Sequence, residues 1–201
     1  TLTMENAQLQ QERYELESLR ELYEIDETTS DYEKTGARVI ASDATNWFYS
    51  FTIDKGSDDG IEVDMNVIAG GGLVGRVVSV GPNYARVLSI IADNSNVYGT
   101  VLTTSANLLV SGNLQSVMTD GVISFEQLSD RENQVQSGDK VVTSNISSKY
   151  LPDIPIGYIA SIETAANNMT KYGTITPAVD FQHLQEVLVI LEKKQQVTDE
   201  E

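Results

Sequence analysis

The sequence predicts a mainly β protein in which an N-terminal coiled-coil helix precedes two related β-units. Three observations support this fold class. An apolar residue recurs every seven positions over residues 1–27, bulky side chains occupy every second position from Trp47 onward, and the β-pattern around Val67 returns 74 residues later. Spacing by seven places side chains along one helix face, and spacing by two is the period of a strand with one buried face.

The first 27 residues predict a helix about 40 Å long, at 1.5 Å per residue, that forms a parallel dimer stalk. Between its seam positions the segment is mostly Glu, Gln and Arg, which are good helix formers. An Asn in the seam would specify register and favour two strands. The alternative is a single helix, either packed on its own β-domain or left in solvent. The seam residues are Leu2, Asn6, Leu9, Leu16, Leu19 and Tyr23.

A polar stretch at residues 28–36 ends the seven-residue pattern and is expected to be a linker. The first β-unit then covers residues 37–103. From Trp47 to Ile53 the odd-numbered side chains form the face that we expect to be buried. Residues 58–60 read Asp-Asp-Gly, which predicts a turn because Gly accepts a positive φ without steric cost.

A second β-unit is predicted over residues 104–193, because it repeats positions of the first. The first three matches are offset by 74 residues and the last three by 82, so eight residues are inserted between them. Each copy has a turn, a buried strand, a loop and a strand with a single Gly. Convergent β-patterning remains the alternative to a true repeat. The first copy contains Ile61, Val67, Ile68, Gly75, Val77 and Val80, and the second contains Val135, Val141, Val142, Gly157, Ile159 and Ile162.

Four shorter segments complete the chain. Residues 111–113 and 119–121 are turn signals that we expect to be flanked by short apolar strands. Residues 187–191 form a last apolar strand, which could return to either unit. Residues 194–201 are charged and expected to be disordered.

Composition limits the function. The formal net charge of −17 disfavours nucleic acid and anionic lipid surfaces, which are bound through clustered Lys and Arg. No cysteine is present, which excludes a disulfide framework and thiolate zinc. No apolar run approaches the 18 or so residues that span a membrane. Because the chain begins inside a helical pattern, we expect a further segment upstream.

The chain resembles the extracytoplasmic domain of MreC, the bacterial rod shape-determining protein, because several sequence blocks occur in the same order. The blocks read NWF, TIDKGSDDGI, GLVGRVVSVGPNYARVL and DNSNV, followed by SGDKVVTS, IPIGYI and the segments at 179–181 and 188–189. Together they cover roughly residues 36–193, behind a helix similar to that of the family. One departure is the loop at residues 145–150, where the family usually has a glycine-richer turn.

This resemblance implies that the two β-units are small antiparallel β-barrels. It further implies a non-enzymatic scaffold that organises lateral peptidoglycan synthesis on the extracytoplasmic face of the bacterial membrane. A single membrane anchor would lie upstream of Thr1. The implied partners are a second copy in a homodimer or filament, the elongation transpeptidase of the penicillin-binding class, and MreD with other proteins of the elongation complex. β-strand addition at an exposed edge is one physical route to such contacts.

Two other functions were weighed against this hypothesis. A degenerate two-barrel hydrolase is disfavoured because no serine follows the lone His183, and no nucleophile-elbow motif is present. A periplasmic ligand-binding module would need a deep apolar pocket, which a sequence does not reveal. The Gly70 to Gly75 match to a dinucleotide fingerprint is followed by a strand instead of the required helix. The sequence therefore predicts no catalytic residue, cofactor or metal ion.

The candidate partner surface comprises Trp47, Phe48, Arg76 and Arg86. Trp47 and Phe48 present aromatic rings to both faces of one strand, and one of those faces must be core. The two arginines interrupt apolar strands. Each could anchor a partner or pair with an acid on the outer face of its own unit.

Overall fold

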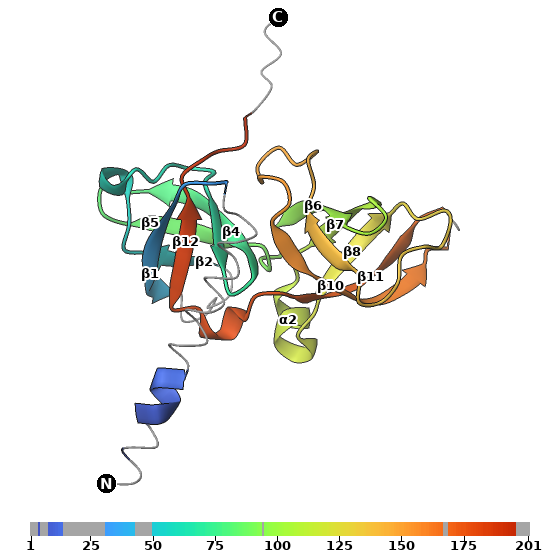
Figure 1. Ribbon diagram of the computed structural model, residues 1–201, viewed down its shortest axis with the longest axis horizontal. Coiled ribbons are helices and arrows are strands. Elements are labelled where there is room, and N and C mark those ends of the chain that lie inside the picture. The colour runs from blue at the N-terminus through green and yellow to red at the C-terminus, as the bar shows by residue number, and fades with distance from the viewer. Residues whose placement is uncertain are drawn as a thin grey trace, which may run out of the picture.

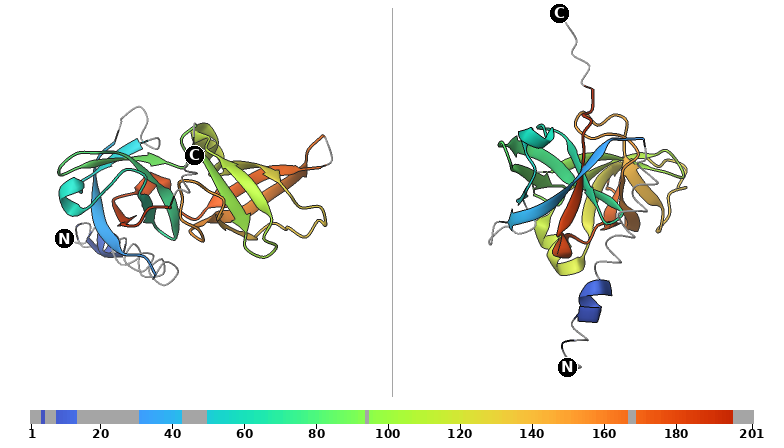
Figure 2. Two further views of the ribbon diagram at one scale, coloured as in Figure 1. Left: turned by 90° about the horizontal axis from the view of Figure 1, so that it is seen from above. Right: turned by 60° about the vertical axis from the view of Figure 1, so that its left-hand side comes forward.

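The computed structural model describes residues 4, 8–13, 31–42, 50–93, 95–166 and 169–195. It confirms the predicted fold class: two closed six-stranded antiparallel barrels lie side by side, and residues 8–13 near the N-terminus are helical (Figure 1). A view from above shows the same pair (Figure 2).

The first barrel has the strand order β1-β12-β3-β4-β5-β2. A 3-10 turn at Ser57–Asp59, ended by Gly60 at φ 84°, occupies the predicted turn. The strands are β1 (Lys34–Ser42), β2 (Ser50–Ile53), β3 (Asn66–Ala69), β4 (Gly72–Val80), β5 (Ala85–Ser89) and β12 (Glu186–Ile190).

The second barrel has the order β10-β11-β8-β7-β6-β9. Its strands are β6 (Asn96–Val101), β7 (Asn107–Ser111), β8 (Ile123–Leu128), β9 (Lys140–Thr143), β10 (Pro155–Thr164) and β11 (Lys171–Pro177). The short helix α2 (Leu114–Asp120) projects from it, so the strand expected between the two turn signals is wrong. The turn residues cap this helix instead: Asn113 accepts a hydrogen bond from the Ser116 amide, and Gly121 ends the helix with φ 68°.

The boundary expected at residue 103 is wrong, because β6 pairs with β7 and β9 of the second barrel. The first barrel also begins earlier than expected, since β1 starts at Lys34 inside the expected linker. The last strand, which the sequence left open, belongs to the first barrel, where β12 pairs with β1 and β3. In Figure 1 the red β12 lies beside the blue β1.

The internal repeat is confirmed by the strand register. Val67 pairs with Gly75 across β3 and β4, and Val141 pairs with Gly157 across β9 and β10. Both glycines are required by a close approach of the next strand: an added Cβ would lie 2.0 Å from the Leu88 carbonyl oxygen at Gly75 and 2.1 Å from that of Thr176 at Gly157.

The repeat extends to irregular features. The register of β4 against β5 shifts between Val77 and Ser79, and that of β10 against β11 shifts between Ile159 and Ser161. These positions are equivalent at the offset of 82. Such matching bulges are specific, because a bulge re-aims the strand and is retained within a family.

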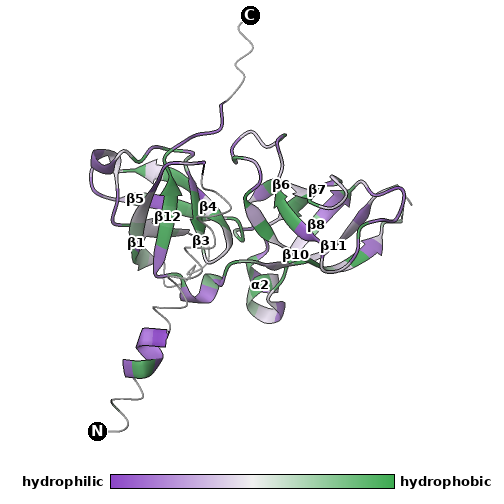
Figure 3. Cartoon of the chain, in the orientation of Figure 1, coloured by the Kyte–Doolittle hydropathy of each residue, from purple (hydrophilic) through white to green (hydrophobic). Residues whose placement is uncertain are grey.

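Each barrel is filled by side chains from the inner faces of its strands. Phe51 and Ile53 of β2 are buried as the alternation predicted. Phe125 of β8 occupies a comparable place in the second barrel. Figure 3 shows apolar residues concentrated on the strands and polar residues on the connections. Full burial of such a side chain contributes about 1.5–3 kcal/mol. The buried apolar residues of the two barrels form one continuous cluster.

Candidate interaction surfaces and the joint between the barrels

The predicted surface residues do not form one site in the structure. Trp47 and Phe48 lie outside the described residues. Arg86 is exposed on β5, opposite Thr52 of β2 and Ser79 of β4, on the outside of the first barrel. Arg76 is half-buried between the barrels, so it is part of the internal architecture.

Of the six predicted seam residues, only Leu9 is described. It lies exposed within the helical residues 8–13, where the Gln8 amide donates to the Glu12 carboxylate one turn later. Leu2, Asn6, Leu16, Leu19 and Tyr23 lie outside the described part. The coiled-coil dimer therefore stays a prediction.

A polar joint connects the barrels. Its first part is an ion pair within the first barrel, where Arg76 Nη1 lies 2.7 Å from Asp64 Oδ1. Asp64 has φ 72°, and its backbone amide donates to the Val77 carbonyl, so its carboxylate is held close to β4. The Arg76 and Ser95 side chains lie close enough to the Tyr150 hydroxyl to lower its pKa. Burial outweighs them and raises the pKa of Tyr150, which keeps its hydroxyl protonated.

The second part of the joint is Asn66, a fully buried polar residue on β3. Its side-chain amide donates to the Lys149 carbonyl at 3.0 Å, and its side-chain oxygen accepts from the Leu151 amide at 2.8 Å. Both ends of one side chain thus bind the backbone on either side of Tyr150. Buried backbone groups need such partners, because an unsatisfied group costs about 1–3 kcal/mol.

The element that docks is the loop at 144–154, between β9 and β10. It contains the eight residues inserted in the second copy of the repeat, and it includes the stretch where the sequence departs from the glycine-richer family turn. Beside it β4 meets β10 closely, since a Cβ on Gly72 would lie 2.7 Å from the Pro155 carbonyl oxygen. The insertion therefore supplies the contact that joins the barrels.

The chain leaving β12 adds one ion pair within the first barrel and one hydrogen bond across the same junction. Lys193 pairs with Glu62 of the first barrel, and Lys194 Nζ donates to the Asn145 carbonyl of the loop at 3.1 Å. Tyr32, just before β1, packs against the core. Its pKa is raised by burial and then by the nearby carboxylates of Glu192 and Asp153.

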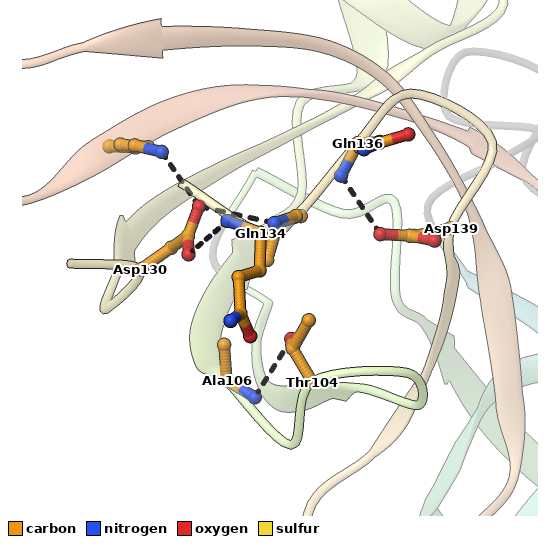
Figure 4. A network of polar contacts seen from close by, with 8 residues as sticks. Thr104, Ala106, Asp130, Gln134, Gln136 and Asp139 are labelled. Carbon is orange, nitrogen blue, oxygen red and sulfur yellow. Dashed lines mark hydrogen bonds and ion pairs between the residues drawn. The ribbon is translucent and has the colours of Figure 1, made fainter. Parts of the chain in front are cut away.

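A second ion pair stabilises the far end of the second barrel. Lys171 Nζ lies 2.6 Å from Asp130 Oδ2, and both side chains are largely buried. The Asp130 carboxylate also accepts from the backbone amides of Gln134 and Val135 (Figure 4). Burial by itself would raise the pKa of Asp130, but the hydrogen bonds from Lys171 and the two amides outweigh it, so the pKa is lowered.

One surface groove contains His183. It is lined by residues 38–42 of β1 and 182–186 before and at the start of β12. His183 lies 2.7 Å from Asp180, yet both side chains are exposed, so solvent screens the pair. Ser42 lines the same groove, but no hydrogen bond joins it to His183 in the described chain. The groove therefore lacks the nucleophile–base contact of a serine hydrolase.

Three other features would indicate a function: a metal site, a membrane-spanning helix and a free sheet edge. Across the described ranges, no group of three or more His, Cys, Asp or Glu side chains is placed to hold a metal ion. Among the helices that the structure describes, none has the length and apolar character needed to span a membrane. Closure of both sheets also leaves neither barrel with a whole strand unpaired along one side, so edge-strand addition is not favoured.

Two closed barrels joined by polar contacts define a class of double-barrel β proteins. The family model for "Rod shape-determining protein MreC, barrel core" matches residues 39–191. The chain therefore belongs to the MreC family.

Relatives and solved structures agree. The cell shape-determining protein MreC of Listeria monocytogenes is 32% identical over 192 residues, which are 92% of this chain and 64% of the relative. That of Haemophilus influenzae is 26% identical over 90% of this chain and 50% of its own length. The chain thus spans about half to two thirds of these relatives. A solved MreC from Listeria monocytogenes superposes with a TM-score of 0.74 at 28% identity, covering 98% of this chain and 96% of that one.

Proposed function

We propose that the chain is the extracytoplasmic part of a membrane-anchored scaffold that organises lateral peptidoglycan synthesis and so maintains rod shape. The observation that carries the proposal is the family match across both barrels. A solved neighbour described as the major periplasmic domain of a cell shape-determining filament supports the extracytoplasmic placement and a capacity to self-associate.

The expected principal partner is the elongation transpeptidase of the penicillin-binding class. A structural neighbour with a TM-score of 0.57 is the MreC of Helicobacter pylori in complex with penicillin-binding protein PBP2. At 11% identity that likeness concerns the fold, and the complex serves as a precedent for the partner. MreD and other elongation-complex proteins are further expected partners, and a second copy would pair through the stalk.

The mechanism proposed is binding without catalysis. A scaffold alters a synthase by binding one of its conformations more tightly than another, which shifts the population of states. Such a scaffold must hold its own surfaces in constant relation. The Asn66 hydrogen bonds supply this property by tying the two barrels together.

The test is binding of the chain to the extracytoplasmic domain of the elongation transpeptidase from the same cell, measured by biolayer interferometry. Saturable binding is expected, and binding should persist after removal of residues 1–30 if the barrels carry the contact. Absence of binding at the highest soluble concentration would contradict the proposed partner. The truncation must stop before Asp31, because Tyr32 packs on the core and β1 begins at Lys34.

Light scattering of the same two chains tests the stalk. We expect a dimer that becomes monomeric when residues 1–30 are removed. A dimer that survives the truncation would move self-association onto the barrels.

A further inference from the structure

The joint uses one row of side chains on the outside of the first barrel. Asn66 of β3 pairs with Arg76 of β4. On the other side of β3, Val189 of β12 pairs with Val67, so the next residue, Ile190, lies beside Asn66. The row Ile190–Asn66–Arg76 therefore crosses three neighbouring strands.

The second barrel carries the equivalent row. Lys140 of β9 pairs with Tyr158 of β10, and these residues correspond to Asn66 and Arg76 at the two offsets of the repeat. On the other side of β9, the Leu102 amide donates to the Lys140 carbonyl at 2.9 Å. Since β6 takes the place that β12 takes in the first barrel, Leu102 corresponds to Ile190.

The two rows differ in what covers them. Ile190 and Asn66 have no exposed surface, and the Arg76 side chain is 18% exposed. The loop at 144–154 binds the central residue of this row, Asn66. In the second row Leu102 is 57% exposed and Tyr158 is 46% exposed. Lys140 is half-buried, and no ion pair to it is found within the described residues. The second barrel thus has a row equivalent to the one at the joint, but no loop of the described chain is bound to it.

We propose that the row Leu102–Lys140–Tyr158 is the surface on which the transpeptidase partner docks, through a loop that presents an apolar side chain beside a carboxylate. This inference rests on the proposed function. The apolar side chain would cover Leu102 and the Tyr158 ring. The carboxylate would form an ion pair with the Lys140 ammonium group. This attraction is strongest when the contact excludes water.

A loop is the expected occupant because both barrels are closed, so an added strand would find no free edge along β6, β9 or β10. A second copy is disfavoured on two grounds. Its own loop at 144–154 is already engaged by its Asn66, and two chains that each carry a net charge of −17 repel one another.

The experiment compares Leu102→Asp and Lys140→Glu with the unsubstituted chain in binding to the extracytoplasmic domain of the elongation transpeptidase. Met118→Asp is the matched control. Met118 is 56% exposed on α2, which packs against β8, three strands away from β9 around the second barrel. Circular dichroism and urea unfolding check that each variant is folded.

We expect each of the two row substitutions to weaken binding by about tenfold or more, and Met118→Asp to change it less than twofold. Unchanged binding by both row variants would overturn the docking surface and leave the proposed function intact. Failure of the unsubstituted chain to bind would overturn both. Loss of self-association by Leu102→Asp, with transpeptidase binding unchanged, would identify a second copy as the occupant and overturn the assignment made here.

Discussion

The two barrels share one strand order and differ in where one strand comes from. Starting from the equivalent strands β3 and β9, the orders are β3-β4-β5-β2-β1-β12 and β9-β10-β11-β8-β7-β6. The second barrel is continuous in sequence, whereas the first takes its last member from the C-terminal end of the chain. The second barrel is therefore an insertion within the first, and its two connections to the first barrel lie before β6 and after β11.

This difference gives the joint its role. Because the second barrel is inserted at two points, its orientation depends on contacts beyond those connections. Asn66 makes hydrogen bonds to residues 83 and 85 positions away in sequence. At the equivalent position the second barrel has Lys140, whose side chain makes no hydrogen bond to the other barrel within the described residues. One repeated surface has become an internal contact in one barrel and an exposed face in the other.

The largest expected effect separates these two positions. Asn66→Ala leaves the buried Leu151 amide and the partly buried Lys149 carbonyl without their side-chain partner, and should lower the free energy of unfolding by about 2–4 kcal/mol. Lys140→Ala at the equivalent position should change it by less than about 0.5 kcal/mol. Urea unfolding followed by tryptophan fluorescence and circular dichroism measures both. Equal losses would contradict the different roles assigned to the two rows.

The next effect tests what the barrels share. An added methyl group at Gly75 or Gly157 would meet a backbone carbonyl oxygen, so Gly75→Ala and Gly157→Ala should each destabilise the chain by about 1–3 kcal/mol or more. Gly36→Ala is the control, because nothing lies within 4 Å of its added Cβ. Thermal unfolding of the three variants compares them. A loss of stability in only one of the Gly75→Ala and Gly157→Ala variants would show that the two barrels close differently.

A pH effect on stability should arise in the second barrel. The pKa of Asp130 is lowered in the folded chain, so its contribution to stability is complete above the unfolded pKa of about 3.9 and is lost as the pH falls through the lower folded pKa. Asp130→Asn should therefore destabilise the chain at pH 7 and flatten its acid unfolding below about pH 4. Urea unfolding between pH 7 and pH 3 measures the slope. An unchanged slope would contradict the role of the Lys171 pair.

The last prediction compares the stability losses of two arginine variants, Arg76→Ala and Arg86→Ala, because the sequence treated these arginines alike. Arg86→Ala removes an exposed side chain and should change stability by less than about 0.5 kcal/mol. Arg76→Ala removes the partner of Asp64 and a neighbour of the Tyr150 hydroxyl, and should cost about 1–3 kcal/mol. Denaturation curves recorded in parallel test the difference, and a larger loss for Arg86 would contradict the placement of the joint.

Much of the fold could be predicted from local patterns. The alternation at Phe51 and Ile53 indicated the buried face of β2, and the echo of Val67 and Gly75 in Val141 and Gly157 anticipated equivalent strand pairs. The capped helix α2 was missed because its capping residues, Asn113 and Gly121, are also common turn residues.

The candidate site was less predictable. Arg76 was noticed because a charge interrupts an apolar strand, but whether it met a partner or its own chain depended on the loop at 144–154. Asn66 gave little signal, since a single Asn before an apolar strand is ordinary. The one available indication was the eight-residue insertion between the copies, because it marked the loop that contacts the first barrel.

By itself the sequence determined the β-content, the repeat and the resemblance to the MreC family, because strand period and turn chemistry act over a few neighbouring residues. Only the tertiary structure decided that β12 completes the first barrel, that Asn66 and Arg76 face the inserted loop, and that the Leu102–Lys140–Tyr158 row is left uncovered. These outcomes depend on which distant segments meet, and a local period shows that a face is buried without showing what buries it.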